Sequence, residues 1–385
     1  MDEKIIKKYN LNSTDDTILF LDIGCNNLSI IKELSNVIIL DHHKYYSLDK
    51  ISNSIFILNP EDFGISGSFY ACASSICYIV SILMDKSNVE YSPLALIGID
   101  GDRQVFESIN KKVLDDAINN NFITQKYSYK LGDGYLYDIF NESIDPFIGI
   151  NGNEKSIKNF FLRYGLKNKL ISSLEYDEII VFKNSILNVL KKFNCEHSIN
   201  YIFGNNSILK NMIINDIHDF SSILTICGQS NNPSLGVSLC YCNNNSLQEA
   251  KNISLNIKKK MVSDLLALYN NKKVFEYVLY FYGKNLISAG EIASTIARYR
   301  CNSKVIICFN ETNDNEIKVS GRCSTNLIKD GVNLSIAFFN SAKLVGGFGG
   351  GHDIASGGII PINTHKKFLS SINDIIKKQI NHLKK

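Results

Sequence analysis

The run Val-Ile-Ile-Leu at 37–40 ends directly in Asp41, His42 and His43. Continuous Val, Ile and Leu runs are typical of strands that are buried on both faces of a parallel sheet. Open α/β sheets bind their ligands outside the carboxyl ends of such strands. The segment therefore predicts an α/β fold in which a carboxylate and two imidazoles, all good ligands for a divalent metal ion, stand at a binding edge.

Two further apolar segments end in carboxylates. Ile-Leu-Phe-Leu at 18–21 runs into Asp22, and residues 94–98 run into Asp100 and Asp102. We therefore expect three strand ends to deliver a carboxylate each, with Asp100 and Asp102 as alternatives at the third. A mixed set of nitrogen and oxygen ligands suits a hard-to-borderline cation such as Mn²⁺.

Strands and helices alternate from residue 17 to about 115, with a further apolar run at 55–58 and with 94–99 as either a strand or a helix, which predicts a doubly wound parallel sheet. Apolar residues recur with helical spacing from 246 to 270, as expected of a long connector helix. Strands are expected after it at 274–281, 304–309, 316–320 and 357–360, which indicates a second, smaller α/β domain. The expected domains are 1–115, a mixed middle region 116–245, the connector 246–272 and the second domain 273–385.

The composition is that of a globular protein, with 45% hydrophobic residues in a chain of 385. No apolar run approaches the roughly 18 residues of a membrane span, and the first residues do not resemble a signal peptide. The net charge of only +3 excludes a broadly basic surface but permits a local groove for a nucleic-acid strand. Ten cysteines without a C-x-x-C pair predict reduced thiols and a cytoplasmic location.

The Asp-His-His triplet and the segment GGFGGGHDIASGG at 346–358 together resemble the DHH phosphoesterase superfamily. In that family the glycine-rich segment is the GGGH loop of the DHH-associated substrate domain. The resemblance implies a metal-dependent phosphoesterase in which Gly349, Gly350, Gly351 and His352 bind substrate. Glycines suit this role because backbone N–H groups approach a phosphate closely where no Cβ intervenes.

The segment LIGIDGDRQ at 96–104 is similar to a motif of archaeal RecJ-like proteins, the branch that associates with GINS. The similarity makes Asp102 the preferred ligand over Asp100, so the implied metal ligands are Asp22, His42 and Asp102. His43 is then the catalytic residue that contacts the scissile phosphate. Ser-Gly-Arg at 320–322 resembles the Ser-x-Arg strand of the substrate domain, in which Arg322 would grip a phosphate.

The family's first motif, an acidic D-x-D-G cluster, has no counterpart ahead of Asp22. Asp15 and Asp16 form the acidic pair available there, and they stand at the start of the expected strand, the wrong end for the site. We therefore expect the first βα unit and its ligands to be missing, and about one Mn²⁺ per chain, with Mg²⁺ as the alternative ion. Either the start codon lies upstream or the chain is a truncated paralogue.

Two functions follow from the resemblance. The first is a metal-dependent exonuclease on single-stranded DNA or RNA, weakened by the loss of one motif and serving DNA replication and repair. The second is a catalytically inactive scaffold of the archaeal replicative helicase complex that binds GINS. The surviving ligands Asp22, His42 and Asp102 favour the enzyme, whereas the missing first motif favours the scaffold. Neither function involves a membrane.

Overall fold

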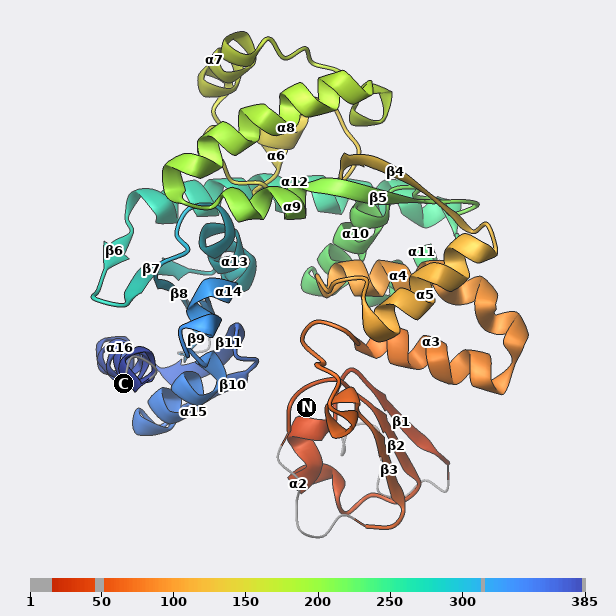
Figure 1. Cartoon of the computed structure of the whole chain (residues 1–385). Helices are drawn as coiled ribbons and strands as arrows, with labels where there is room; N and C mark the ends of the chain where they lie inside the picture. The colour runs from red at the N-terminus through yellow and green to blue at the C-terminus, as the bar shows by residue number, and fades with distance from the viewer. Residues whose placement is uncertain (1–15, 46–51, 313–315, 383–385) are drawn as a thin grey trace. The chain divides into compact units, whose positions relative to one another are not determined.

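The computed structural model describes residues 16–45, 52–312 and 316–382. The chain divides into two compact units (Figure 1). The first unit comprises residues 1–125, 207–225 and 238–243, and the second comprises 126–206, 226–237 and 244–385. The acidic residue Asp15 of the expected first-motif region lies outside the described residues.

The first unit contains a parallel sheet with the strand order β1-β2-β3. Its strands are β1 (Ile18–Leu21), β2 (Val37–Leu40) and β3 (Ile55–Leu58), as the apolar runs predicted. Leu21, Leu40 and Leu58 stand opposite one another at the last position of each strand. All three strands therefore end at one edge of the sheet, which is where Asp22 and Asp41 follow.

The prediction that residues 94–98 form a third strand ending at Asp100 and Asp102 is wrong. Residues 94–99 belong to the helix α4 (Ser92–Gly101), and Asp102 caps the C-terminus of that helix. Pro93 in the first turn suits a helix start, and a short apolar run cannot be distinguished from a buried helix by periodicity. Asp102 thus reaches the site from a helix end rather than from the sheet.

The other helices of the first unit pack on α4 or on the sheet. The described α-helices that lie wholly in this unit, apart from α4, are α2 (Leu28–Ile31), α3 (Ala73–Met84) and α5 (Ser108–Asn119). One face of the sheet packs on α2 through Phe20, Ile31 and Ile39, all of which are buried. This packing holds β1 and β2 in the register that brings their last residues together.

The second unit contains a mixed six-stranded sheet with the order β10-β11-β9-β8-β7-β6. Only β7 and β8 pair in parallel, and the other neighbours are antiparallel. The strands are β6 (Lys273–Val274), β7 (Val278–Lys284), β8 (Val305–Glu311), β9 (Glu316–Arg322), β10 (Phe348–Gly351) and β11 (Ala355–Pro361).

Side chains of β8 alternate between two hydrophobic cores, as successive residues of a strand must. Ile306 and Cys308 pack in the core that includes α13 (Ala289–Tyr299). Ile307 and Phe309 pack in the core that includes α15 (Leu334–Leu344) and α16 (His365–His382). The sheet is therefore covered by α13 on one face and by α15 and α16 on the other.

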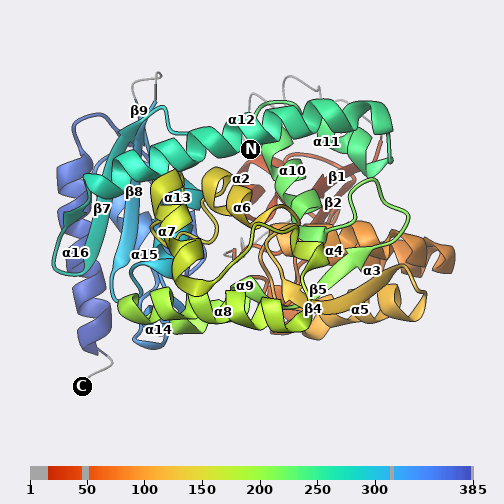
Figure 2. The same cartoon turned by 90° about the horizontal axis from the view of Figure 1, so that it is seen from above.

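The helix expected at 246–270 is present as α12 (Asn244–Asn270), a single long helix of the second unit (Figure 2). The remaining described α-helices and strands are α6 (Leu136–Glu142), α7 (Glu154–Tyr164), α8 (Tyr176–Leu190), α9 (Ile199–Ile202), α10 (Ile217–Gln229), α11 (Pro233–Cys240), α14 (Thr325–Lys329) and the paired strands β4 (Ile123–Tyr129) and β5 (Phe203–Leu209). Among the described residues, no helix is both long and apolar enough to cross a membrane.

Candidate metal centre

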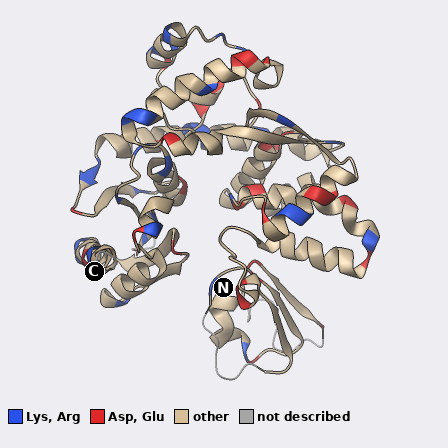
Figure 3. Cartoon of the chain, in the orientation of Figure 1, with Lys and Arg blue, Asp and Glu red and all other residues tan. Residues whose placement is uncertain are grey.

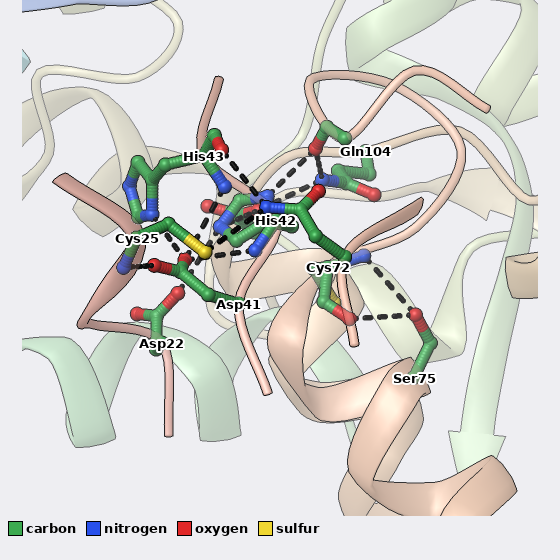
Figure 4. Close-up of polar contacts among 11 residues, drawn as sticks. Asp22, Cys25, Asp41, His42, His43, Cys72, Ser75 and Gln104 are labelled. Carbon is green, nitrogen blue, oxygen red and sulfur yellow. Dashed lines mark hydrogen bonds and ion pairs between the residues drawn. The ribbon is translucent and has the colours of Figure 1, made fainter. Parts of the chain in front are cut away.

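Of the three predicted metal ligands, Asp22 and Asp102 lie near the Nε2 atom of the third, His42. Figure 4 shows Asp22 and His42 with the residues around them. Oδ1 of Asp22 lies 3.1 Å from this nitrogen, and Oδ2 of Asp102 lies 3.7 Å from it. Asp22 follows β1 with a φ of 64°, a left-handed conformation that aspartate tolerates better than most residues. Three donors from the ends of β1, β2 and α4 thus face one point.

The imidazole of His42 is held by the loop that precedes α3. Nδ1 of His42 donates to the carbonyl oxygen of Gly67 over 2.7 Å, and the histidine is 3% exposed. Because Nδ1 is occupied by this hydrogen bond, Nε2 is the ring atom that faces Asp22 and Asp102, and it is the atom that would bind a metal ion once its proton is displaced. A Cβ on Gly67 would lie 1.9 Å from the backbone oxygen of His42, so this close approach requires glycine.

Gln104 connects the same carbonyl to the third ligand. Its Nε2 donates to the oxygen of Gly67 over 2.7 Å and to Oδ2 of Asp102 over 2.9 Å. Asn110 in turn donates to Oε1 of Gln104 over 2.9 Å. These bonds orient both His42 and Asp102 from one buried amide. Sequence reasoning quoted Gln104 within a motif but assigned it no role.

Asp41 orients neighbouring groups instead of facing the other proposed metal ligands, contrary to the expectation from its place beside the histidines. It is 1% exposed, and its oxygens accept hydrogen bonds from the backbone N–H groups of Cys25 and His42 and, over 2.7 Å, from Nδ1 of His43. Burial raises the pKa of Asp41, but these hydrogen bonds outweigh it and hold the pKa well below its usual range.

His43 joins the cluster through its second ring nitrogen. Because Nδ1 donates to Asp41, Nε2 carries the lone pair. Ligand atoms of Asp22, His42 and His43 all lie within 4.8 Å of one another. His43 is more exposed than His42, with about a third of its side chain accessible (32%). It is therefore the more accessible histidine of the pair.

The electrostatics of the cluster suit a cation. Burial alone would lower the pKa of His42, but the hydrogen bond to Asp22 and the charge of Asp102 raise it to about 9. Removal from water raises the pKa of Asp102, and the charge of Asp22 raises it further. The charge of His42 lowers this pKa but does not outweigh them, so the net shift is upward. Asp22 and Asp102 thus favour a second proton on Nε2 of His42. A divalent ion that replaces this proton would meet the same two carboxylates, and the donor set fits Mn²⁺ or Mg²⁺.

Asp100, the alternative at the third position, points elsewhere. Its Oδ2 accepts hydrogen bonds from Nδ1 of His218 over 3.0 Å and from the hydroxyl of Ser221. Burial raises the pKa of Asp100, but His218 and Ser221 lower it more, so the net shift is downward. Asp100 therefore joins α4 to the start of α10, and Asp102 is the carboxylate of this segment that faces His42.

Replacing Gln104 by alanine should weaken Mn²⁺ binding by about 10- to 100-fold, the usual effect of losing a group that orients metal ligands. Asp102 would lose a hydrogen bond, and the carbonyl of Gly67 that holds His42 would lose its second donor, while every proposed ligand remains. Isothermal titration of the metal-free chain with MnCl₂ measures the affinity and the number of ions bound. Unchanged affinity would show that Gln104 has no part in the metal centre.

The predicted phosphate-binding residues lie in the second unit, at one end of its sheet. Arg322 ends β9 and stands opposite Ala355 of β11, whose carbonyl accepts from the backbone N–H of His352. Nε of Arg322 donates to the hydroxyl of Ser294 on α13 over 2.9 Å. Arg322 and His352 are therefore at the same end of the sheet, and the guanidinium is oriented by α13.

Residues 348–351 form the edge strand β10 rather than a loop. A Cβ on Gly349 would lie 2.8 Å from the carbonyl oxygen of Phe338, and Gly351 has a φ of 138° with Ala355 close by. Packing and backbone conformation thus explain these two glycines. A Cβ on Gly350, in contrast, would meet no described atom within 4 Å, so its missing side chain leaves open space.

Comparison with known proteins agrees with this architecture. A family model described as the DHHA1 domain matches residues 270–378. The uncharacterized protein MJ0831 of Methanocaldococcus jannaschii is 28% identical over 397 residues, which cover 98% of this chain and 84% of that protein.

Two solved structures share the fold across nearly the whole chain. CDC45 from Entamoeba histolytica has a TM-score of 0.64 at 13% identity, covering 97% of this chain and 87% of that chain. RecJ from Thermus thermophilus in complex with Mn²⁺ has a TM-score of 0.56 at 11% identity, covering 97% of this chain and 46% of that chain. With the DHHA1 match, these likenesses confirm the expected resemblance to the RecJ-like DHH superfamily and the α/β fold with a second sheet domain.

Proposed function

We propose that this chain, with its RecJ-like DHH fold and its DHHA1 domain, is a metal-dependent phosphodiesterase that removes nucleotides from single-stranded DNA or RNA. The observation that carries the proposal is the geometry around Nε2 of His42, which Asp22 and Asp102 approach to 3.1 and 3.7 Å. A structural protein has no need of two carboxylates turned toward an oriented imidazole.

Asp22, His42 and Asp102 would hold one Mn²⁺, or Mg²⁺ in its place. When bound, such an ion lowers the pKa of a coordinated water and polarises a phosphoryl oxygen. The structure of RecJ from Thermus thermophilus was determined with Mn²⁺, which supports the choice of ion. Gly67 would keep His42 oriented, because its hydrogen bond is to Nδ1 and leaves Nε2 available, and Gln104 would hold Asp102 through Oδ2.

His43 would contact the scissile phosphate. Asp41 accepts a hydrogen bond from Nδ1 of His43, which fixes the orientation of the ring and leaves its Nε2 edge available for that contact. Its side chain is 32% exposed, which makes this contact sterically accessible.

The proposal is tested by incubating end-labelled single-stranded DNA and RNA with the purified chain in Mn²⁺, in Mg²⁺ and in chelator. A ladder that shortens from one end and requires the divalent ion supports an exonuclease. Equal products with and without the metal would contradict the assignment, because the proposed centre has no catalytic group that replaces the ion.

A second candidate, the GINS-binding scaffold, is favoured by the TM-score of 0.64 to CDC45, which exceeds that to RecJ. Such a scaffold would keep the fold without cleaving nucleic acid. Affinity capture with purified archaeal GINS, run beside the cleavage assay, separates the two functions. Tight GINS binding by a chain that is inactive with every divalent ion would establish the scaffold.

Arg322→Ala should weaken binding of single-stranded nucleic acid by about 1.5–3 kcal/mol, the range for a hydrogen bond to a charged group. A planar guanidinium pairs with two phosphate oxygens at once, so Arg322→Lys should restore only part of the affinity. Fluorescence anisotropy of a labelled oligonucleotide at fixed salt measures the change. Equal affinity of wild type and Arg322→Ala would leave Arg322 as a structural partner of Ser294.

A further inference from the structure

Phe348 lies on the edge strand β10 with 83% of its side chain exposed. A single exposed apolar residue is ordinary, because much of any protein surface is apolar. Phe348 differs in having an apolar neighbour, Ile359, which stands directly opposite on β11 and is 39% exposed. Partners in an antiparallel pair share one face, so the two side chains form a continuous apolar ridge.

The face of the sheet that carries this ridge follows from Gly349. A Cβ on Gly349 would approach Phe338 and Ala342 of α15, so position 349 points toward that helix. Side chains alternate along a strand, and Phe348 and Gly350 therefore point to the opposite face. Arg322 belongs to the same face, since its guanidinium reaches Ser294 of α13.

The strand register places three rows of residues on this face. In order along the strands they are Phe348, Ile359 and Lys318; then Gly350, Gly357 and Ser320; then Ala355 and Arg322. The middle row contains two glycines, and a Cβ on Gly350 would meet no described atom within 4 Å. An apolar ridge and a cationic row are thus separated by a floor that is nearly free of side chains.

The spacing of the rows fits more than one nucleotide. Neighbouring rows are two residues, or about 7 Å, apart along a strand, so the row of Phe348 and the row of Arg322 are about 14 Å apart, and Phe348 is also two strands, or about 10 Å, to the side of β9. Such a span accommodates a base on the ridge, a sugar over the glycines and the phosphate of a neighbouring nucleotide at the guanidinium. Lys318, which is exposed beside Ile359, adds a second positive charge to the face. An apolar protein segment would find no match for these cations.

We propose that Phe348 is a stacking platform for a nucleobase of the bound strand, while Arg322 holds a phosphate of a neighbouring nucleotide. The proposal rests on the proposed function, because it assumes that the substrate is a single-stranded nucleic acid. Phenylalanine has no hydrogen-bonding group, and every base has a π-face, so the platform accepts all bases. Phe348 thus supplies affinity and register without selecting a sequence.

The chain has no tryptophan, so Phe348→Trp creates a single fluorescent reporter at the platform. Binding is measured in chelator, which prevents cleavage, with a short oligothymidylate and with an abasic sugar-phosphate strand of the same length and charge. Stacking of a base on the indole should quench its fluorescence upon addition of oligothymidylate, whereas the abasic strand should leave it unchanged.

Affinity provides the second readout. Phe348→Ala should weaken oligothymidylate binding by roughly 5- to 150-fold, the equivalent of losing one stacked base. It should not change the affinity for the abasic strand, whereas Arg322→Ala should weaken both. Phe348→Tyr should bind as wild type does. Phe339→Ala, which removes a 56% exposed phenylalanine from α15, is the matched control and should change neither affinity.

The outcomes separate the two proposals. Equal oligothymidylate affinity for wild type and Phe348→Ala, with Arg322 still required, would overturn the platform and leave the proposed function standing. Failure of the wild-type chain to bind either strand would overturn both. Since Phe348 is largely exposed, Phe348→Ala should melt at the wild-type temperature, and a lower melting temperature would show that the residue packs structurally and overturn the platform.

Discussion

Replacing His42 by alanine should abolish metal-dependent cleavage of single strands, with a rate loss of roughly three orders of magnitude or more. His42 is the residue on which Asp22 and Asp102 converge, and it is 3% exposed and fixed by Gly67. Without the imidazole, two carboxylates on separate elements would have to hold the ion alone. Initial rates with end-labelled DNA, at several Mn²⁺ concentrations, measure the loss.

His197→Ala is the matched control, because His197 is an exposed histidine of the second unit. It should cleave at the wild-type rate. Any binding of GINS should survive His42→Ala, since the substitution removes a ligand inside the first unit and leaves its surface unchanged. Robust cleavage by His42→Ala would show that the catalytic centre lies elsewhere in the chain.

Gly67→Ala should damage both the fold and the metal centre. The added Cβ would lie 1.9 Å from the backbone oxygen of His42, and backbone atoms cannot rotate away as a side chain can. We expect a loss of about 3 kcal/mol in the free energy of unfolding, the upper part of the range for atoms forced into a packed site. Displacing the carbonyl that holds His42 and Gln104 should also weaken Mn²⁺ binding by about 10- to 100-fold or more.

Gly228→Ala separates this clash from the general effect of replacing glycine. Gly228 lies within α10, and its added Cβ would meet no described atom within 4 Å. That variant should be neutral or more stable by about 0.4–1 kcal/mol, because alanine restricts the unfolded chain. Urea unfolding and Mn²⁺ titration of both variants test the comparison. A wild-type Mn²⁺ affinity in Gly67→Ala would remove Gly67 from the support of the metal centre.

The local sequence was sufficient for the parallel strands and for the placement of two proposed ligands. Apolar runs at 18–21, 37–40 and 55–58 form β1, β2 and β3, as short apolar segments between turns predict, although Leu19 and Phe56 are exposed on one face of the sheet. Asp22 and His42 then follow from chain order, since residues after neighbouring parallel strands meet at one edge. Four strands of the second unit, β7, β8, β9 and β11, were likewise expected within about four residues of their observed bounds, whereas β6 and β10 were not.

Tertiary structure decided the rest. Residues 94–99 became a helix because apolar runs of this length fit either a buried strand or a buried helix, and the surrounding packing selects between them. The supports of the site, Gly67 and Gln104, come from segments whose contact with His42 exists only once the loop has folded over it. The sequence likewise predicts Asp41 as a metal ligand. In the structure its carboxylate is buried, and its oxygens accept hydrogen bonds from backbone N–H groups instead. Hydrogen-bond partners across the chain depend on three-dimensional position, and no local pattern of residues specifies them.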